Sequence, residues 1–265
     1  MCFYNGIIVK RAEHIRLNKI EKEILQYDIQ LKIPMQSGFA FGNWPVIKLK
    51  EGGGDFELVM MHWELIPFYL KTQSELEHFR KGGLNPKTGK IDPPRNTLNA
   101  IGEEVLDKVT YKQAVLKRRC LVLSSGFYEW RHYKSPGAKK ESTYPYRITL
   151  KDKEYFFMAG IWQPWTDQES GEMINSFAIL TTAANPLMEQ IHNKKKRMPV
   201  ILPDELAWQW IQEGLTENQI RELARYQLPE SAMEAYTIAK DFRESEDPTA
   251  PYSYPELSQP QQSLF

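Results

Sequence analysis

The residue best equipped for chemistry is Cys2, which directly follows the initiator methionine in MCFYNGIIV. Because the second residue is small, Met1 can be removed, and Cys2 then carries a free α-amine beside its thiol. That amine, with a pKa of about 7.7–8.0, is partly neutral near pH 7, and thiolates are strong nucleophiles. With an aldehyde, an aminothiol forms a Schiff base that closes to a thiazolidine; with an amide, the thiolate attacks while the amine acts as base. Otherwise Cys2 is an ordinary apolar residue near a terminus.

Three other polar residues are candidates to assist Cys2. Asn99, in TLNAIGEEV, can orient a group because it donates and accepts hydrogen bonds, although its commoner role is in a turn. Glu129 lies in the aromatic run GFYEW, where loss of hydration would raise its pKa, unless it faces water. His192, near the end of a predicted helix, can shuttle protons or complement the helix dipole. The chemistry requires these groups to converge with Cys2 in a pocket open to solvent.

The elements that must position these residues are short strands and helices without regular βαβ alternation. Runs of apolar, aromatic and β-branched residues predict strands at 45–50, 56–65, 119–130, 144–150, 154–162, 176–184 and 198–202. Helical spacing predicts helices at 12–28, 110–119, 185–193, 204–214 and 216–226. Cap signals support three of them: Asn185 with Pro186, Thr110 with Gln113, and Thr216 with Gln219. The pattern predicts one α+β domain with a mostly antiparallel, barrel-like sheet flanked by helices.

Composition divides the chain into two parts. Residues 1–240 form the predicted domain, and residues 241–265 form an acidic, Pro-rich tail that we expect to be mobile. A long Gly-, Pro- and Lys-rich loop is predicted at 81–97. The 34 Lys and Arg residues balance 34 Asp and Glu residues, so total charge gives no signal for nucleic acid or membrane.

The two cysteines indicate where the protein works. Cys2 and Cys120 form neither a CxxC pair nor a zinc pattern, which predicts a reduced, cytoplasmic protein without structural disulfides, metal or cofactor. No apolar run approaches the roughly 20 residues of a membrane span, and the start lacks the pattern of a secretory signal. We expect no membrane partner and a monomeric protein.

Together these motifs resemble one family, the SOS-response-associated peptidase (SRAP) domain proteins. The resemblance spans about residues 2–240. Its motifs, in order, are Cys2, HWELIPF at 62–68, Asn99-Ala100, GFYEW at 126–130, and His192 ahead of Arg197-Met198-Pro199-Val200. HWELIPF is similar to the family's Trp-Gly-Leu-Ile-Pro stretch, with Glu64 in place of glycine. The chain departs from the family at Tyr4 and Ile101, where arginines are usual, and at Glu104, where threonine is usual.

The resemblance implies a sensor of abasic sites in single-stranded DNA. The ring-opened sugar of such a site carries an aldehyde, which Cys2 would trap as a thiazolidine DNA–protein crosslink after self-removal of Met1. By the same resemblance, Asn99 would hold the Cys2 amine and His192 would assist Schiff-base formation. Glu129 would move protons during ring opening, ring closure and lyase-like reversal.

The DNA-binding candidates are basic residues and two wall residues. The cations are Arg197, Lys194, Lys195 and Lys196, with Arg95, Lys87 and Lys90 in the long loop. Trp63 and Pro67 would shape the DNA-facing wall, and ordinary core packing is the alternative for Trp63. Our hypothesis is that the NKKKR stretch replaces part of the charge lost at Tyr4 and Ile101.

Two rival functions stay open. A glutaminase-type amidohydrolase also begins Met-Cys and uses the liberated amine as base, although Gly-Ile normally follows where Phe3-Tyr4 stand here. The other rival is a non-covalent single-strand binding module in which Cys2 is incidental.

Overall fold

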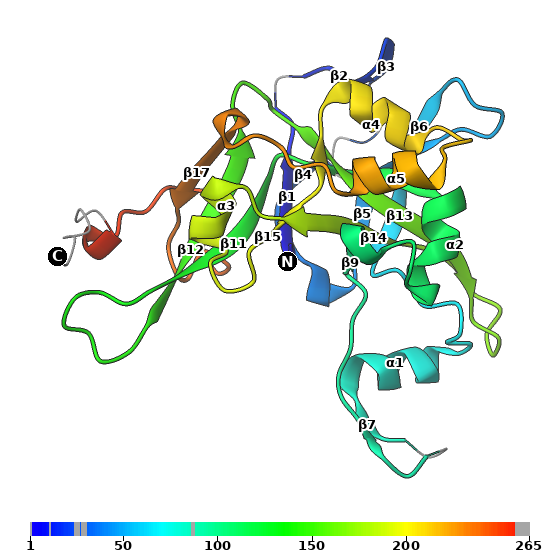
Figure 1. Cartoon of the computed structure of the whole chain (residues 1–265), viewed down its shortest axis with the longest axis horizontal. Coiled ribbons are helices and arrows are strands. Elements are labelled where there is room, and N and C mark those ends of the chain that lie inside the picture. Colours follow the sequence, from blue (N-terminus) through cyan, green and yellow to red (C-terminus); the bar gives the residue numbers. More distant parts are fainter. Residues whose placement is uncertain (1, 11, 24–26, 28–30, 86–87, 258–265) are drawn as a thin grey trace.

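Five strands close into a barrel in this computed structural model, which describes residues 2–10, 12–23, 27, 31–85 and 88–257 (Figure 1). Around the ring the order is β14, β6, β5, β10 and β13, and β13 pairs back with β14. The strands are β5 (Asn43–Leu49), β6 (Phe56–Trp63), β10 (Arg119–Ser124), β13 (Phe156–Thr166) and β14 (Met173–Ala183). Only the β6–β14 pairing in this ring is parallel. The prediction of a single α+β domain with a mostly antiparallel, barrel-like sheet is therefore confirmed.

Three short strands extend the barrel and carry candidate residues to it. β9 (Asn99–Ile101) runs parallel to β14, and β15 (Arg197–Pro199) runs antiparallel to the same strand. β16 (Ile201–Leu202) pairs instead with β13. The predicted strand at 198–202 is thus two strands, because Val200 bonds across to both β14 and β13.

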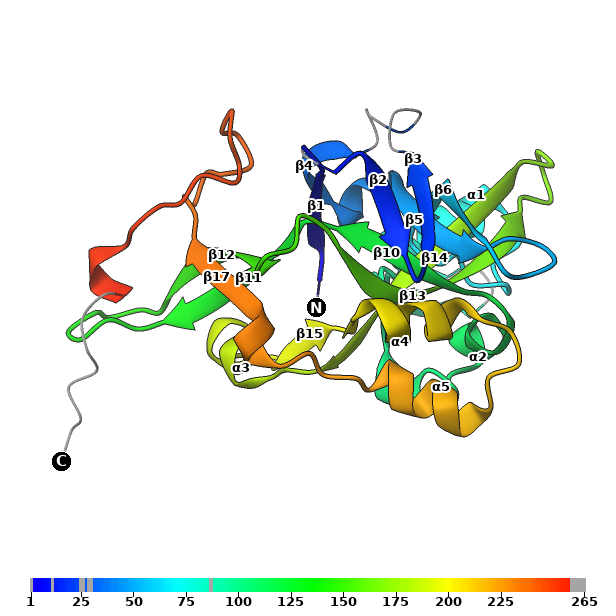
Figure 2. The same ribbon diagram turned by 90° about the horizontal axis from the view of Figure 1, so that it is seen from above.

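A second, five-stranded sheet lies beside the barrel in the order β17, β12, β11, β1 and β4 (Figure 2). Its strands are β1 (Tyr4–Ile8), β4 (Lys32–Ser37), β11 (Gly126–Tyr133), β12 (Ser142–Leu150) and β17 (Met233–Thr237). The chain passes from barrel to second sheet at Ser125, whose N–H donates to the Gly6 carbonyl oxygen at 2.8 Å. The single strand predicted at 119–130 is therefore divided between β10 and β11. Alternation along β11 puts Glu129 on the face opposite Tyr128 and Trp130, both of which pack on Phe242.

Five α-helices lie within the described residues: α1 (Gln73–Lys81), α2 (Val109–Lys117), α3 (Pro186–Ile191), α4 (Asp204–Ile211) and α5 (Glu217–Ala224). α2, α4 and α5 gather on one side of the barrel, whereas α3 packs against β11 and β15 (Figures 1 and 2). As predicted, Asn185 caps α3 and Thr216 with Gln219 forms a capping box on α5. The capping box predicted at Thr110 is wrong, because α2 begins one residue earlier and has no side-chain cap.

The amphipathic helix predicted at 12–28 is also wrong. β2 (His14–Leu17) and β3 (Ile20–Glu23) form an antiparallel hairpin that turns at Asn18, whose φ is 57°. Ile15 and Leu17 point inward in the two-residue alternation of a strand. The helix prediction rested instead on Leu17, Ile20, Ile24 and Tyr27, whose three- and four-residue spacing is helical. The rest of the predicted helix lies mostly outside the described residues.

α1 is a helix that the sequence argument did not predict. Thr72 caps it by accepting a hydrogen bond from the Glu75 N–H at 3.2 Å, so the Thr-x-x-Glu spacing was a usable signal. The long loop that follows contains a small hairpin, β7 (Gly83–Leu84) with β8 (Ile91–Asp92). In Figure 1, α1 and this hairpin extend away from the barrel as a separate lobe.

The polar segment after residue 240 is packed rather than mobile as far as residue 257. Phe242 is buried, with its ring stacked on Tyr128 at 5.3 Å between centroids. Farther on, the Tyr144 hydroxyl donates to Glu256 at 2.9 Å. Residues 241–257 therefore cover one face of the second sheet, on the side away from Glu129, and 258–265 lie outside the described residues.

Glu64 occupies a backbone conformation that favours glycine and carries a buried charge. Its φ is 150°, and its side chain is fully buried. Arg80 of α1 donates from Nε to a Glu64 carboxylate oxygen at 2.6 Å, lies 3.9 Å from the centroid of the Phe41 ring, and also contacts His62. Burial raises the pKa of Glu64, and Arg80 opposes that shift. The ion pair thus joins the α1 lobe to the barrel.

Replacing Arg80 with Met should destabilise the protein by about 3–5 kcal/mol, because Glu64 would remain buried without its partner. The double variant Glu64→Gly/Arg80→Met should recover most of this loss, since glycine adopts the required φ without strain. Urea unfolding at pH 7 measures both. Lys81→Met, which breaks an exposed pair on the same helix, is the control and should cost less than about 1 kcal/mol. Equal effects of Arg80→Met and Lys81→Met would contradict this account.

Candidate functional site

Asn99 is held directly against the backbone of Cys2. The side-chain Nδ2 of Asn99 donates to the Cys2 carbonyl oxygen at 2.9 Å, across the gap between β9 and the start of β1. Its Oδ1 is buried and has no hydrogen-bond partner within the described residues. Tyr111 of α2 reaches the same place, since its hydroxyl donates to the Asn99 carbonyl oxygen at 3.4 Å. Asn99 is therefore fixed from two sides with an acceptor oxygen to spare.

Glu129 and His192 meet at the junction of β11 and α3. His192 Nε2 lies 3.7 Å from a Glu129 carboxylate oxygen, and both side chains are largely buried. The second ring nitrogen, Nδ1, lies 2.8 Å from the Arg197 carbonyl oxygen, which only accepts, so Nδ1 carries the proton. Neutral His192 therefore presents an unprotonated Nε2 toward Glu129.

Burial shifts both pKa values in opposite directions. Loss of hydration raises the pKa of Glu129 to about 7. The same loss lowers the pKa of His192 to about 4. Near pH 7 the pair thus combines a neutral imidazole with a carboxyl group that gains and loses its proton readily.

The Cys2 thiol is closed off from solvent. Cys2 has 0% exposure, and its Sγ lies 3.8 Å from the Tyr4 carbonyl oxygen. Burial raises the pKa of this thiol, and the negative charge of Glu129 raises it further, so the two groups are within electrostatic reach. The expectation of a pocket open to solvent is therefore wrong for the chain with Met1 in place. The structure nevertheless brings Cys2 to Asn99 and into the field of Glu129, which in turn adjoins His192.

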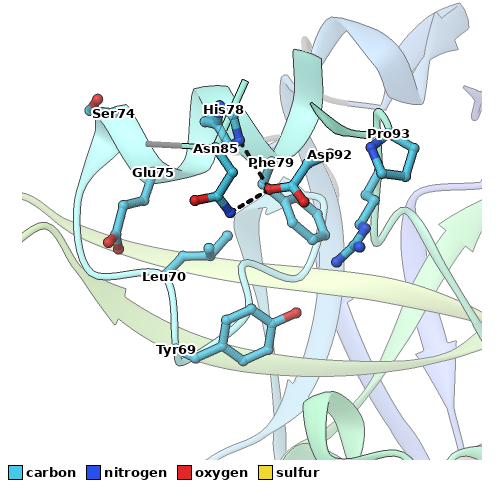
Figure 3. Close-up of a pocket in the computed structure, with 10 residues that line it drawn as sticks. Tyr69, Leu70, Ser74, Glu75, His78, Phe79, Asn85, Asp92 and Pro93 are labelled. Atoms are coloured by element: carbon cyan, nitrogen blue, oxygen red, sulfur yellow. Dashed lines mark hydrogen bonds and ion pairs between the residues drawn. The ribbon is translucent and has the colours of Figure 1, made fainter. Parts of the chain in front are cut away.

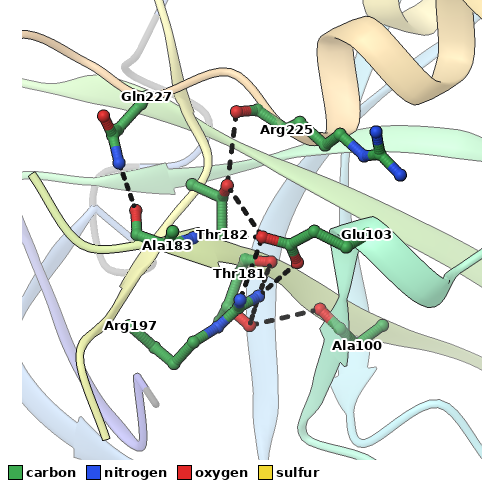
Figure 4. A network of polar contacts seen from close by, with 8 residues as sticks. All are labelled: Ala100, Glu103, Thr181, Thr182, Ala183, Arg197, Arg225 and Gln227. Carbon is green, nitrogen blue, oxygen red and sulfur yellow. Dashed lines mark hydrogen bonds and ion pairs between the residues drawn. The ribbon is translucent and has the colours of Figure 1, made fainter.

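Arg197 is engaged in a network of polar contacts (Figure 4). Its guanidinium donates to both carboxylate oxygens of Glu103, at 2.9 and 2.7 Å, and to the Thr181 carbonyl oxygen at 2.5 Å. Burial acts to raise the pKa of Glu103, but the bonds from Arg197 and from the backbone hold it below its usual value. This bidentate pair competes with any phosphate for Arg197.

The three lysines beside His192 differ in their contacts. Lys194 pairs with Glu141 at 3.0 Å, and Lys196 lies 3.8 Å from Glu189. Lys195 is exposed, and within the described residues no ion pair is found for it. Its charge acts to lower the pKa values of both Glu129 and His192. Lys195 is therefore the lysine of this stretch whose field reaches the candidate site.

Trp63 and Pro67 do not form an exposed wall. Trp63 is fully buried between Trp44 and Phe177, with its indole N–H donating to the Leu98 carbonyl oxygen at 3.2 Å. Pro67 is buried as well. Ordinary core packing accounts for Trp63, and the prediction that it borders the DNA is corrected accordingly.

The exposed aromatic residues were not identified from the sequence. Phe68 and Tyr69 follow Pro67 and meet edge to face at 5.6 Å between ring centroids. Phe39 is exposed as well and packs on Phe3, the neighbour of Cys2, at 4.9 Å. The sequence does show aromatic residues next to the HWELIP motif and next to Cys2. It does not show which of them are exposed, because the fold decides that.

Tyr4, Ile101 and Glu104, the three positions that depart from the family, differ in their contacts and exposure. Tyr4 accepts a hydrogen bond from Arg243 at 3.3 Å, and this guanidinium lies 5.7 Å from the centroid of the Tyr4 ring. Ile101 is exposed at the end of β9, and Glu104 pairs with Lys108 at 3.2 Å. A cation from residues 241–257 therefore stands beside the position where the family usually has an arginine.

The remaining basic candidates lie in the lobe. Arg95 is exposed, and its backbone N–H donates to the Phe79 carbonyl oxygen at 2.9 Å. Lys90 is exposed in the small hairpin, and Lys87 lies outside the described residues. In the described part of the chain, no cluster of three or more His, Cys, Asp and Glu side chains is arranged to hold a metal ion. No helix there is long and apolar enough to cross a membrane.

Comparisons with known proteins agree with this fold and identify the family. The sequence model of the SOS response associated peptidase (SRAP) family matches residues 18–245. The chain is 28% identical over 194 residues to the abasic site processing protein YoqW of Bacillus subtilis, covering 73% of this chain and 75% of that protein. It is 29% identical over 171 residues to the abasic site processing protein HMCES of Xenopus tropicalis, covering 59% of this chain but 45% of that protein.

Comparison with solved structures finds the same fold in another protein. A crystal structure of a protein from Bacteroides thetaiotaomicron superposes with a TM-score of 0.73 at 30% identity, covering 94% of this chain and 97% of the other. With a family match over most of its length, the chain belongs to the SRAP family.

Glu129→Gln should change the pH dependence of stability. Because the pKa of Glu129 is raised from 4.5 to about 7 on folding, the folded chain binds more protons than the unfolded chain in this window. The wild type should therefore lose up to about 3 kcal/mol relative to Glu129→Gln as the pH rises from 4.5 to 7. Urea unfolding across this range, on protein whose N-terminus is defined by mass spectrometry, measures the difference.

The difference between the two proteins is the correct readout, because His192 acts in the opposite sense. Its lowered pKa stabilises the folded chain increasingly as the pH rises from about 4 to 6.5. His192 is present in both proteins, so its contribution largely cancels. Parallel stability curves for the wild type and Glu129→Gln would contradict the burial-raised pKa.

Proposed function

We propose that this protein processes abasic sites in single-stranded DNA by capturing the ring-opened sugar on Cys2 after Met1 is removed. The observation that carries the proposal is the convergence of a candidate N-terminal aminothiol, an amide and a proton-transfer pair. Asn99 bonds the Cys2 carbonyl at 2.9 Å, and Glu129, whose charge acts on the Cys2 thiol, lies 3.7 Å from His192. The names of the relatives YoqW and HMCES support the substrate class.

The capture is a condensation that releases one water molecule. The Cys2 amine adds to the aldehyde carbon, and loss of the former carbonyl oxygen as water gives an imine. The thiol sulfur then adds to the imine carbon, and its proton passes to the nitrogen, which completes the thiazolidine. Each step needs a group that both gives and takes a proton near pH 7, and Glu129, with its pKa near 7, is suited to that role.

The other residues hold the reacting groups. We assign the unpartnered Oδ1 of Asn99 to accept a hydrogen bond from the freed Cys2 amine. The unprotonated Nε2 of His192 accepts a hydrogen bond from protonated Glu129 or from a bridging water, which orients the carboxyl group during imine formation. These are positions for proton transfer once the site is opened to DNA.

Removal of Met1 by the protein itself would use the same nucleophile. The Cys2 sulfur adds to the Met1 carbonyl carbon, and the Cys2 nitrogen leaves as the free amine. Water then hydrolyses the resulting thioester and releases methionine. Because burial keeps this thiol protonated, its attack needs a base, and Glu129, whose charge acts on the thiol, is suited to take the proton.

The DNA-binding surface combines exposed rings with cations around this centre. Phe39, Phe68 and Tyr69 are flat exposed surfaces on which bases of a single strand can stack. Lys195 supplies charge at the candidate site. Arg243 adds a guanidinium beside Tyr4, on the face of the second sheet away from Glu129. The hypothesis that NKKKR replaces lost positive charge is thereby narrowed to Lys195.

Purified protein incubated with a single-stranded oligonucleotide carrying one abasic site should give a slow band on a denaturing gel. Cys2→Ala, and protein whose freed Cys2 amine has been acetylated, should give none, because each lacks the aminothiol. Cys120→Ala is the matched control and should retain the band, since the second cysteine is buried elsewhere in the core.

Four results would decide against this function. One is no band from wild-type protein whose loss of Met1 is verified by mass spectrometry. Another is a band that persists in Cys2→Ala. The third is glutamine hydrolysis without crosslinking, which would favour the N-terminal-nucleophile amidohydrolase. The fourth is affinity for single strands without either activity, which would favour the non-covalent module.

Lys195→Gln should weaken binding to single-stranded DNA and reduce the slope of log affinity against log salt by about 1. Lys194→Gln and Lys196→Gln are controls with smaller expected effects, because both lysines already contact carboxylates. Fluorescence anisotropy at four salt concentrations measures all three. Indistinguishable slopes would show that Lys195 has no special contact with the strand.

A further inference from the structure

The lobe built from residues 69–95 contains a cavity of about 410 Å³ that the proposed chemistry does not use (Figure 3). Leu70, Phe79 and Pro93 give it apolar walls, and the exposed ring of Tyr69 lies at its edge. A cavity of this size accommodates a flat heterocycle with room for ordered water.

One wall of this cavity is a hydrogen-bonded polar cluster. Asp92 accepts a hydrogen bond from Asn85 Nδ2 at 2.7 Å, and His78 Nε2 lies 3.2 Å from the same carboxylate oxygen, Oδ2 (Figure 3). The bond from Asn85 and the contact with His78 lower the pKa of Asp92, which keeps it an acceptor at neutral pH. Within the described residues, the other oxygen, Oδ1, has no hydrogen bond. Arg95, also on the lining, adds donors to the same cavity.

The cavity lies close to the candidate site along the chain. Arg95 is four residues before Asn99, so their Cα atoms are at most about 14 Å apart. On the other side, Tyr69 follows the segment in which Leu65 exchanges hydrogen bonds with Thr97, at 3.3 and 2.7 Å. A strand bound at Cys2 would therefore pass within a few nucleotides of the cavity opening.

We propose that this cavity is a subsite for one unstacked base of the bound single strand, with guanine preferred. The proposal rests on the proposed function, because it needs a strand held near Cys2. Guanine presents two adjacent donors, N1–H and N2–H, to the Asp92 carboxylate and two acceptors, O6 and N7, to Arg95. Tyr69 supplies the stacking surface that single-strand binding proteins use.

Adenine is disfavoured by the same chemistry. Its N1 is an acceptor and would face the ionised Asp92 carboxylate, leaving that group unpaired in the complex. Hypoxanthine keeps N1–H and O6 but lacks the amino group, so it should bind between guanine and adenine. The order guanine, hypoxanthine, adenine is therefore the signature of recognition by Asp92.

The test places a single guanine at each position within four nucleotides of an abasic site in an otherwise all-thymine oligonucleotide. At one position, guanine should increase affinity at least about fivefold over adenine, with hypoxanthine between them. Asp92→Asn and Tyr69→Ala should each abolish this preference. Glu77→Gln, on the exposed side of α1 and paired with Lys81, is the control and should retain it.

The same series is measured by anisotropy on strands with an intact thymidine in place of the abasic site. Loss of crosslinking with a retained guanine preference on intact strands would reject the covalent function and keep the subsite. Crosslinking without any preferred position would reject the subsite and keep the function. A guanine preference that survives both Asp92→Asn and Tyr69→Ala would also overturn the subsite.

Discussion

The exclusion of water from the Glu129 carboxyl group is the constraint on which the site depends. A carboxyl group in water is ionised near pH 7, whereas burial at the junction of β11 and α3 raises the pKa of Glu129 to about 7. The same burial keeps His192 neutral and the Cys2 thiol protonated. Two sheets and one short helix are needed to enclose these groups, which is why the nucleophile at the chain start is built into the centre of the fold.

Other buried charges in the protein are compensated, and the contrast identifies their roles. Arg119 is buried beneath α2 and α4, yet its guanidinium donates to the carbonyl oxygens of Val115 and Trp210, each at 2.7 Å. Arg197 forms a bidentate pair with Glu103, and Arg80 donates to one carboxylate oxygen of Glu64. These pairs hold elements together. Arg197 of β15 contacts Glu103, which lies just after β9, and Arg80 of α1 contacts Glu64 directly after β6. For Glu103 the bonds from Arg197 and from the backbone outweigh the cost of burial, whereas for Glu64 Arg80 offsets only part of it.

The chain has the four candidate residues of the family motifs, whereas arginine is replaced at two positions where the family usually has it. Tyr4 and Ile101 stand where arginines are usual, but Arg243 reaches Tyr4 from a segment that packs on the second sheet, and the field of Lys195 reaches Glu129 and His192. Charge near a phosphate backbone acts over several ångströms and does not require a fixed residue position. The reacting atoms do, since proton transfer tolerates only hydrogen-bond distances or a single bridging water.

The sequence by itself determined the fold class, most strands, the caps of α3 and α5, and the identity of the four candidate residues, because these follow from local alternation, cap chemistry and motif order. It did not determine which strands share a sheet: the run through Ser125 reads as one strand until Gly6 pairs with it. Leu17 and Ile20 have the three-residue spacing of a helix, yet they face each other across the β2–β3 hairpin, so only packing decided between the two. Trp63 and Phe68 look equally suited to stack on DNA, and the barrel buried one and exposed the other. Burial is a property of the assembled fold, and with it came the pKa values and the enclosure of Cys2 that local sequence could not specify.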